Sequence, residues 1–204
     1  MLDFQELDPG AIREFIRSHP LGMITAQGGQ GLVATHVPLL VRGEGPVSRL
    51  RGHVMRKTPY WEAFGSAPEV LVAFTGPDAP ILGSWIEEQP YGGTWNYMAV
   101  HLKGKLRYLP QEDLIDILRE LKDTYEVDPS HKFEHLAPDY VPSMIRAIEG
   151  FEIEVTSVQA VFKLSQNRSE SDFERTIEAL RQRGGEHALV AEEMSARRSL
   201  YFGS

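Results

Sequence analysis

Short apolar runs with strand-like character, separated by tight turns, constrain the fold of this chain more than any other feature. Turn residues cluster at 28–31 and 42–46, and no regular alternation of strands with helices occurs. Consecutive strands joined by hairpins pair antiparallel, and their sheet must be closed or covered so that no long edge stays open. We therefore predict a mainly β protein, a small barrel with peripheral helices. The runs lie at 21–26, 32–41, 50–55, 70–74, 79–85, 94–109 and 150–164.

Helical patterns occupy most of the remaining chain. The clearest spans 110–126, where large aliphatic residues recur at helical spacing opposite a charged face. Asp8 followed by proline is typical of a helix start, and Ser169 with the acidic residues after it predicts a capped helix that ends at Arg183. Another short helix is expected at 140–148. We predict one domain over residues 1–184 and a C-terminal tail over 185–204 that is either helical or disordered.

Composition narrows the function classes. The formal net charge is -8 and the basic residues are dispersed, whereas a general nucleic-acid binder carries net positive charge or a basic stripe. The absence of cysteine excludes disulfides and thiolate ligands, and the seven histidines are scattered, so we expect no metal site. No apolar run approaches the ~18 residues that span a bilayer, and the acidic N-terminus is unlike a signal peptide. We expect a cytoplasmic protein without membrane association.

The densest group of polar side chains lies in KLSQNR (163–168), directly after the last strand-like run. An ammonium, a hydroxyl, two amides and a guanidinium fall within this one segment. A strand end holds side chains rigidly, and polar groups that converge there are costly unless a partner satisfies them. The alternative is a solvated turn. Together with two earlier segments, KLSQNR favours a site for an anionic, planar ligand.

The first of these segments places Arg56 and Lys57 between a strand end and a predicted helix N-terminus that Thr58 caps. Helix N-termini attract anions through free N–H groups and the helix dipole. A guanidinium and an ammonium complement a phosphate group, and His53 lies close by in the sequence. The alternative is a solvated basic turn. We predict a phosphate site here.

Two strand segments supply further candidates. Trp95 and Asn96 offer an aromatic wall and an amide for the edge of a heterocycle, although an ordinary strand that packs inward has the same residues. Thr35 and His36 point to opposite faces of their strand, and a lone histidine of this kind is more often structural. The sequence contains no recognisable catalytic motif, so the catalytic residues are unknown.

Three of these segments together resemble the PaiB-like family of bacterial proteins, described as FMN-binding, negative transcriptional regulators of protease synthesis and sporulation. The segments are LRGHVMR (50–56), TWNY (94–97) followed by His101 and Gly104, and KLSQNR (163–168). The resemblance runs in matching order over about residues 1–184. One segment departs from it: PILGSWI (80–86) stands where the family has YISPSWY and keeps only part of that pattern, including Ser84.

The resemblance implies an FMN-binding split β-barrel, related to pyridoxamine-phosphate oxidases and flavin reductases. It also implies a homodimer with the flavin in a cleft between subunits. Arg56 and Lys57 would lie near the phosphate, Trp95 and Asn96 near the ring, and residues of KLSQNR would close the pocket. The expected cofactor-binding residues are Thr35, His36, His53, Arg56, Lys57, Ser84, Trp95, Asn96, Lys163, Gln166 and Arg168.

Three functions fit this resemblance. They are an FMN-binding regulatory or redox protein, an FMN-dependent oxidoreductase of the flavin reductase or pyridoxamine-phosphate oxidase kind, and a DNA-binding transcriptional repressor. The net charge and the lack of a recognisable helix-turn-helix disfavour direct DNA binding. A positive group near flavin N1 stabilises the reduced anion, a part that Lys163 or Arg168 would play. We predict an FMN-binding protein with a regulatory or redox role.

Overall fold

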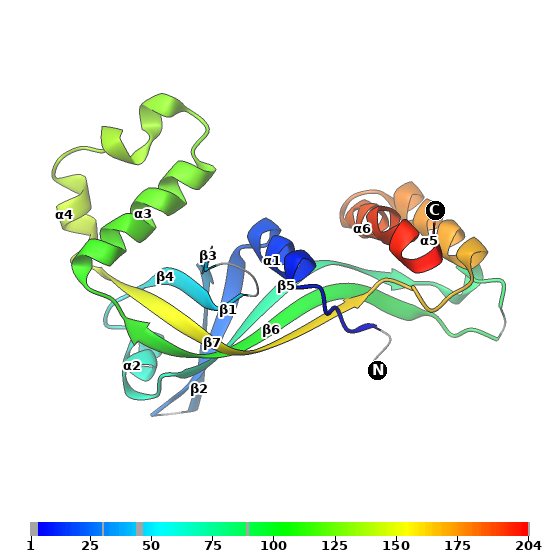
Figure 1. The fold of residues 1–204 in the computed structure, drawn as a ribbon, viewed down its shortest axis with the longest axis horizontal. Coiled ribbons are helices and arrows are strands. Elements are labelled where there is room, and N and C mark those ends of the chain that lie inside the picture. Colours follow the sequence, from blue (N-terminus) through cyan, green and yellow to red (C-terminus); the bar gives the residue numbers. More distant parts are fainter. Residues whose placement is uncertain (1–3, 30, 44–46, 89, 204) are drawn as a thin grey trace. The chain divides into compact units, whose positions relative to one another are not determined.

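The computed structural model describes residues 4–29, 31–43, 47–88 and 90–203, which group into two compact units (Figure 1). The barrel unit comprises residues 8–74 and 101–158, and the hairpin unit comprises residues 1–7, 75–100 and 159–204. Three long strands contribute residues to both units. They are β5 (Glu69–Ile81), β6 (Thr94–Tyr108) and β7 (Ile148–Lys163).

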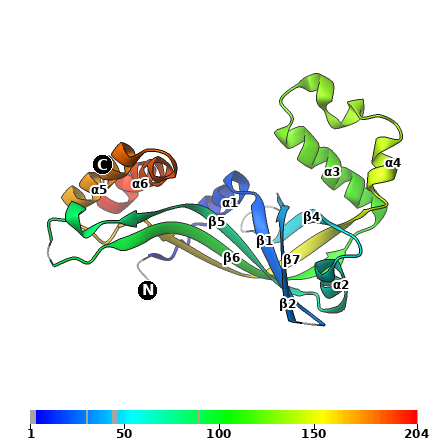
Figure 2. The same ribbon diagram turned by 180° about the vertical axis from the view of Figure 1, so that it is seen from behind.

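The strands of the barrel unit follow the order β2-β1-β5-β6-β7-β4-β3, and the pairings of β1 with β2 and β5, of β3 with β4, and of β4 with β7 are antiparallel (Figure 2). β2 and β3 stand at opposite ends of this order, yet only Leu39 separates them in the sequence. The chain thus passes from one edge of the sheet to the other within one residue, which closes the sheet. The added strands are β1 (Leu21–Gly28), β2 (Gly31–Pro38), β3 (Leu40–Arg42) and β4 (Arg49–Met55).

Two residues make this closure possible. Pro38 ends β2, where its missing N–H is not needed for a ladder hydrogen bond. Gly52 lies where β4 meets the corner: a Cβ there would be 3.2 Å from the Pro38 carbonyl oxygen and 3.0 Å from Leu39 Cδ2. A larger side chain would push the two edges apart. The predicted fold class, mainly β with a closed sheet and peripheral helices, is confirmed.

Helices of the barrel unit begin where the sequence predicts. The Asp8 side chain accepts hydrogen bonds from the backbone N–H groups of Gly10 and Ala11 and starts α1. α3 buries the aliphatic face seen in the sequence, including Ile117. The helix expected over 140–148 is shorter, because the chain enters β7 at Ile148. The helices are α1 (Pro9–Ser18), α2 (Pro59–Ser66), α3 (Gln111–Tyr125) and α4 (Tyr140–Met144), with 3-10 turns at Pro129–His131 and Phe133–His135.

Two of the strand predictions were wrong. The run expected as one strand at 32–41 forms two strands, β2 and β3, separated at Leu39. The runs expected at 70–74 and 79–85 form the single strand β5, followed by a 3-10 turn, η2 (Gly83–Trp85). Inward-facing residues continue past Pro77 and Pro80, so the two prolines do not end the strand. The turns predicted at 28–31 and 42–46 include residues 30 and 44–46, which lie outside the described residues, as do residues 1–3 of the acidic N-terminus.

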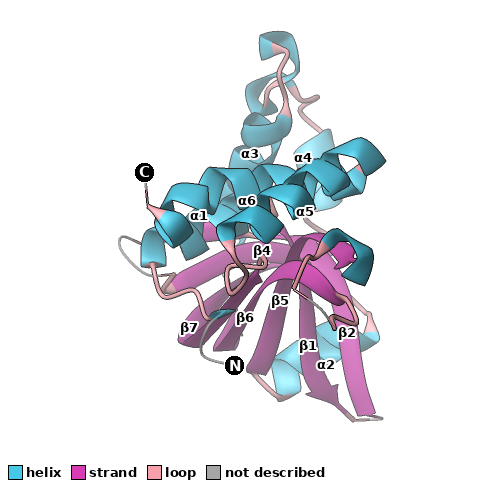
Figure 3. Cartoon of the chain, turned by 90° about the vertical axis from the view of Figure 1, so that its right-hand side faces the viewer, coloured by secondary structure: helices cyan, strands magenta, loops and turns pink. Residues whose placement is uncertain are grey.

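The hairpin unit is built on α5 (Glu170–Arg183) and α6 (Glu186–Phe202), which lie side by side (Figure 3). Gly184 and Gly185 join them with φ angles of +68° and +56°, which favour glycine. The N-terminal segment adds to β7 in this unit, where the Glu6 N–H donates to the Ala160 carbonyl at 3.1 Å. No helix within the described ranges is long and apolar enough to cross a membrane.

Candidate functional site

A cavity of about 230 Å³ in the hairpin unit gathers the polar residues that the sequence singled out. It lies where β6 begins and β7 ends, and we call it the Lys163 pocket. Six of its lining residues come from the two motifs TWNY and KLSQNR: Thr94, Asn96, Lys163, Ser165, Asn167 and Arg168. The loop before β6 and the N-terminal segment complete it with Tyr91, Gly93 and Phe4.

Local backbone geometry presents these side chains. Lys163 is the last residue of β7, and the chain then turns sharply, with the Arg168 N–H donating to the Ser165 carbonyl at 3.0 Å. Ser165 has a φ of +64°, a left-handed conformation that is uncommon for a residue with a side chain. Such backbone strain costs of order 1–3 kcal/mol and clusters at functional sites. The turn therefore holds Ser165 and Arg168 in fixed positions beside Lys163.

The Lys163 pocket is electropositive. The Lys163 ammonium donates to the Thr94 hydroxyl at 2.6 Å and lies 5.7 Å from the Phe4 ring centre. It has no carboxylate partner in the described part of the chain. Arg168 stacks 3.9 Å over the Tyr91 ring, and its ion pair with the exposed Glu88 is long, at 3.8 Å. An exposed pair of this length contributes little, so both cations are available to an electron-rich ligand.

A chain of hydrogen bonds backs the pocket. Asn96 is fully buried, and its carbonyl oxygen accepts from the Ser165 hydroxyl at 3.1 Å. Its amide nitrogen donates to the Met194 sulfur on α6 at 3.5 Å. The sequence predicted that the Asn96 amide binds the edge of a ligand ring. In the structure both its oxygen and its nitrogen already form hydrogen bonds to other protein side chains. Ser165 hydrogen-bonds Asn96 and lines the same cavity.

Three predicted residues of the hairpin unit do not line the Lys163 pocket. Gln166 folds back on its own turn: its oxygen accepts from the Leu164 N–H at 2.8 Å and its nitrogen donates to the Phe162 carbonyl at 2.7 Å. Trp95 is half exposed, on the opposite face of β6 from Asn96, and donates to Asp78 at 2.8 Å. Ser84 lies in η2 and lines a separate hollow against α5.

The other predicted residues belong to the barrel unit. Arg56 directly follows β4, and there its Nε donates to the Ile148 carbonyl at 2.8 Å and its Nη1 lies 2.6 Å from Glu149 Oε2. Lys57 has a φ of +61°. The Thr58 hydroxyl caps α2 by accepting from the Trp61 N–H at 3.3 Å. A phosphate at this position would share Arg56 with Glu149, and the phosphate site stays a prediction.

Histidines in the barrel unit differ in burial. The Nδ1 atom of His53 is buried and has no hydrogen-bond partner within the described ranges. Burial lowers the pKa of His53, so the ring is held neutral. His36 is exposed on β2 and Thr35 is partly buried beside it. Neither of those two side chains has a hydrogen-bond partner among the residues that the structure describes.

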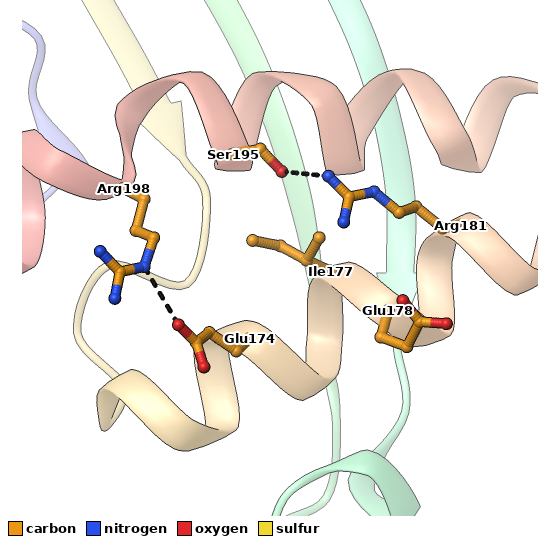
Figure 4. Close-up of a pocket in the computed structure, with 6 residues that line it drawn as sticks. All are labelled: Glu174, Ile177, Glu178, Arg181, Ser195 and Arg198. Carbon is orange, nitrogen blue, oxygen red and sulfur yellow. Dashed lines mark hydrogen bonds and ion pairs between the residues drawn. The ribbon is translucent and has the colours of Figure 1, made fainter.

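A further cavity lies between α5 and α6 and is lined by opposite charges (Figure 4). There the Arg181 guanidinium donates to the Ser195 hydroxyl at 2.9 Å, and Arg198 donates to Glu174 at 3.1 Å. Arg198 is thus paired with a carboxylate, whereas Arg181 is held by a neutral hydroxyl, and the cavity is lined by none of the residues of TWNY or KLSQNR. No group of three or more potential metal ligands occurs among the described residues.

Three of the residues predicted from the sequence, Asn96, Lys163 and Arg168, line the Lys163 pocket. Other residues at this site were not predicted. Thr94 and Ser165 lie inside the quoted motifs, so the motifs themselves were the signal. Tyr91 and Met194 carried no sequence signal, because only the folded chain brings their segments to the pocket and to Asn96.

A family model and a known relative each match most of this chain. The family described as "Putative FMN-binding domain" matches residues 2–157. Protease synthase and sporulation protein PAI 2 of Bacillus subtilis is 33% identical over 194 residues, which cover 94% of this chain and 93% of that protein.

Two solved structures share the fold. The flavocytochrome Anf3 of Azotobacter vinelandii aligns with a TM-score of 0.61 at 16% identity, over 78% of this chain and 69% of that one. The FAD and heme binding protein of Mycobacterium smegmatis aligns with a TM-score of 0.61 at 13% identity, over 78% and 73%. At these identities the alignments concern the fold alone.

Proposed function

Since this chain belongs to the family of FMN-binding domains that matches residues 2–157, we propose that it binds FMN and acts as a flavin-dependent regulatory or redox protein. The family is established by the matched length and by the 33% identity to the Bacillus subtilis protein. The ligand is our inference. It rests on the family description together with the chemistry of the Lys163 pocket.

The observation that carries the proposal is the Lys163 ammonium, held at a strand end without a carboxylate partner among the described residues. A buried or half-buried cation is normally paired, because desolvation without a partner is costly. Within the described residues, the Lys163 ammonium contacts the Thr94 hydroxyl at 2.6 Å and the Phe4 ring at 5.7 Å. Beside it lie the guanidinium of Arg168 and the ring of Tyr91. Cations beside an aromatic wall fit a planar, electron-rich ring.

The residues present fit a flavin. Bound FMN would supply one- and two-electron redox chemistry, which no side chain here can provide. Lys163 and Arg168 would hold the electron-rich part of the ring and favour its reduced, anionic form. Tyr91 would offer an aromatic face, and Ser165 and Thr94 would offer hydroxyl groups to the ring edge.

We further propose that the protein is a homodimer with flavin at the subunit interface. The Lys163 pocket, at about 230 Å³, is below the range of about 300–1,000 Å³ that is usual for a drug-sized ligand. A pocket of this size accommodates part of FMN, and a second copy of the chain would supply further surface. The resemblance to the PaiB-like family supports the same arrangement.

Binding is favoured over catalytic turnover. No histidine, aspartate or glutamate occurs among the described residues that line the Lys163 pocket, so any proton transfer there would fall to Lys163 or Tyr91. A regulatory role would be consistent with the name of the Bacillus subtilis relative. It would act through a partner molecule, because a net charge of -8 disfavours direct DNA binding.

Replacing Lys163 tests the site. Lys163→Met keeps the aliphatic stem but removes the charge, and we expect FMN affinity to fall by about tenfold to a hundredfold, the usual value of a charge-assisted hydrogen bond. Lys103→Met removes an exposed cation in the barrel unit and should leave affinity unchanged. Quenching of FMN fluorescence measures both. Equal affinities in the two variants would remove Lys163 from the site.

A further inference from the structure

The hydrogen bonds behind the Lys163 pocket have a fixed direction. A thioether sulfur can only accept a hydrogen bond, so the group of Asn96 that faces Met194 at 3.5 Å must be its NH₂. The amide carbonyl then faces Ser165, at 3.1 Å. Because a carbonyl oxygen cannot donate, the Ser165 hydroxyl must give its only proton to Asn96. Ser165 is left with lone pairs alone for the cavity that it lines.

The hydroxyl of Thr94 has the opposite polarity. The Lys163 ammonium carries donors only, so Thr94 Oγ1 is the acceptor in their 2.6 Å hydrogen bond. Its own proton has no acceptor among the described residues and remains free. Thr94 lines the same cavity as Ser165. The pocket therefore offers a ligand one hydroxyl that accepts and one that donates.

We propose that the Lys163 pocket recognises a ring edge with neighbouring N–H and C=O groups, as in an imide, and that Met194 on α6 sets this preference. Ser165 accepts from the N–H, and Thr94 donates to the C=O. Met194 touches no ligand and is a positioning residue that acts through Asn96. The proposal rests on the FMN-binding function, and the isoalloxazine ring of FMN has such an imide edge.

A purely structural role for the hydrogen bonds of Asn96 would account for its burial but not for the conformation of Ser165. Asn96 and Met194 are fully buried, and a buried amide needs partners in any protein. That need does not explain why Ser165 adopts a φ of +64° at the wall of the cavity. A strained turn that keeps an acceptor at the cavity wall is what ligand recognition requires.

The test compares FMN with 3-methyl-FMN, which lacks the imide N–H. An acceptor that loses its donor on binding typically costs about tenfold or more in affinity. We expect the native protein to prefer FMN by at least about this factor. Met194→Leu conserves volume but removes the sulfur acceptor, so the amide of Asn96 can turn over and Ser165 can donate to the ligand instead. The preference for FMN should then fall several-fold.

Met98→Leu is the matched control. Met98 is also buried in the hairpin unit, on the same face of β6 as Asn96, but its sulfur has no described hydrogen bond. This variant should keep the native preference, whereas bulk at the methyl group would affect all three proteins equally. Thermal unfolding checks that each variant folds. If Met194→Leu does not fold, Ser165→Ala removes the acceptor directly and should lower the preference as well.

Three results would overturn the proposal, and they are distinguishable. If native protein binds FMN and 3-methyl-FMN equally, the polarity of Ser165 does not select the ligand while FMN binding stands. If Met194→Leu keeps the native preference for FMN, Met194 does not set that preference. If native protein does not bind FMN at all, the proposed function fails and this inference fails with it.

Discussion

Lys163 takes its chemical character from the position that the fold gives it. The same ammonium on an exposed strand would be solvated, as at Lys103. At the end of β7 it meets one hydroxyl and no described carboxylate, beside a turn strained at Ser165. The residue types of KLSQNR indicated a binding site, because polar groups at a rigid strand end need a partner. Which side chains of that segment line the pocket depends on the backbone geometry, and the residue types alone do not determine it.

Arg56 is the residue on which the phosphate prediction depends. We expect Arg56→Ala to weaken FMN binding by about tenfold to a hundredfold while riboflavin, which lacks the phosphate, is unaffected. Arg56 also pairs with Glu149, so Glu149→Gln is the control that breaks the same ion pair but keeps the guanidinium. Fluorescence titration with both flavins measures the difference. Equal losses for FMN and riboflavin would show that Arg56 does not contact the phosphate.

His53 should make stability depend on pH. Burial lowers its pKa below the ordinary value of 6.5, so the unfolded chain takes up a proton near pH 6.5 that the folded chain refuses. The free energy of unfolding therefore falls as pH is lowered through this range, by up to about 1.4 kcal/mol per pH unit for one proton. His53→Gln should flatten this dependence, and the exposed control His36→Gln should not. Urea unfolding at several pH values measures this dependence. If the free energy of unfolding of His53→Gln depends on pH as steeply as that of the native protein, the dependence does not come from His53.

At the scale of elements, strand β7 shows what periodicity can and cannot predict. Alternating apolar residues identified the strand, and its bounds at Ile148 and Lys163 are close to those expected. The alternation did not reveal that Glu152 is buried, because its partners Arg51 and Arg107 come from β4 and β6. Sequence patterns report contacts along one element well. Contacts between elements, such as this one or Asn96 with Met194, require the fold.

Glu152 should be a strong contributor to stability. Burial acts to raise the pKa of Glu152, but hydrogen bonds from Arg51 and Arg107, both at 2.7 Å, outweigh burial and lower it. Glu152→Gln removes the carboxylate that joins the two arginines, but Arg51 keeps an ion pair with Asp113 and Arg107 is largely exposed, so we expect the free energy of unfolding to fall by about 1–3 kcal/mol. Glu154→Gln, two residues on and exposed, should change it by about 0.5 kcal/mol or less. If chemical denaturation gives similar losses of unfolding free energy for Glu152→Gln and Glu154→Gln, the hydrogen bonds of Glu152 to the two arginines do not stabilise the protein as proposed.

At the scale of the whole molecule, the closed sheet follows from one observation about connectivity. β2 and β3 occupy the two ends of the strand order but are joined through Leu39 alone. Hairpin spacing in the sequence predicted that the sheet must close, although it did not indicate where. The expected site residues fall in both units, and those of the hairpin unit that meet in one pocket are Asn96, Lys163 and Arg168.

The dimer is a prediction for the intact chain. Analytical ultracentrifugation should give twice the chain mass of 23.0 kDa. If flavin lies at the subunit interface, added FMN should also shift any monomer present toward dimer, since a ligand that binds one state favours it. A monomer that stays monomeric with saturating FMN would contradict the interface site without excluding flavin binding.

Calorimetric titration of FMN into the purified chain, with flavin fluorescence followed in parallel, tests the central claim most directly. We predict saturable binding at one FMN per chain, quenched fluorescence, and weaker binding of riboflavin. Absence of both binding heat and quenching would contradict the claim that this protein binds FMN.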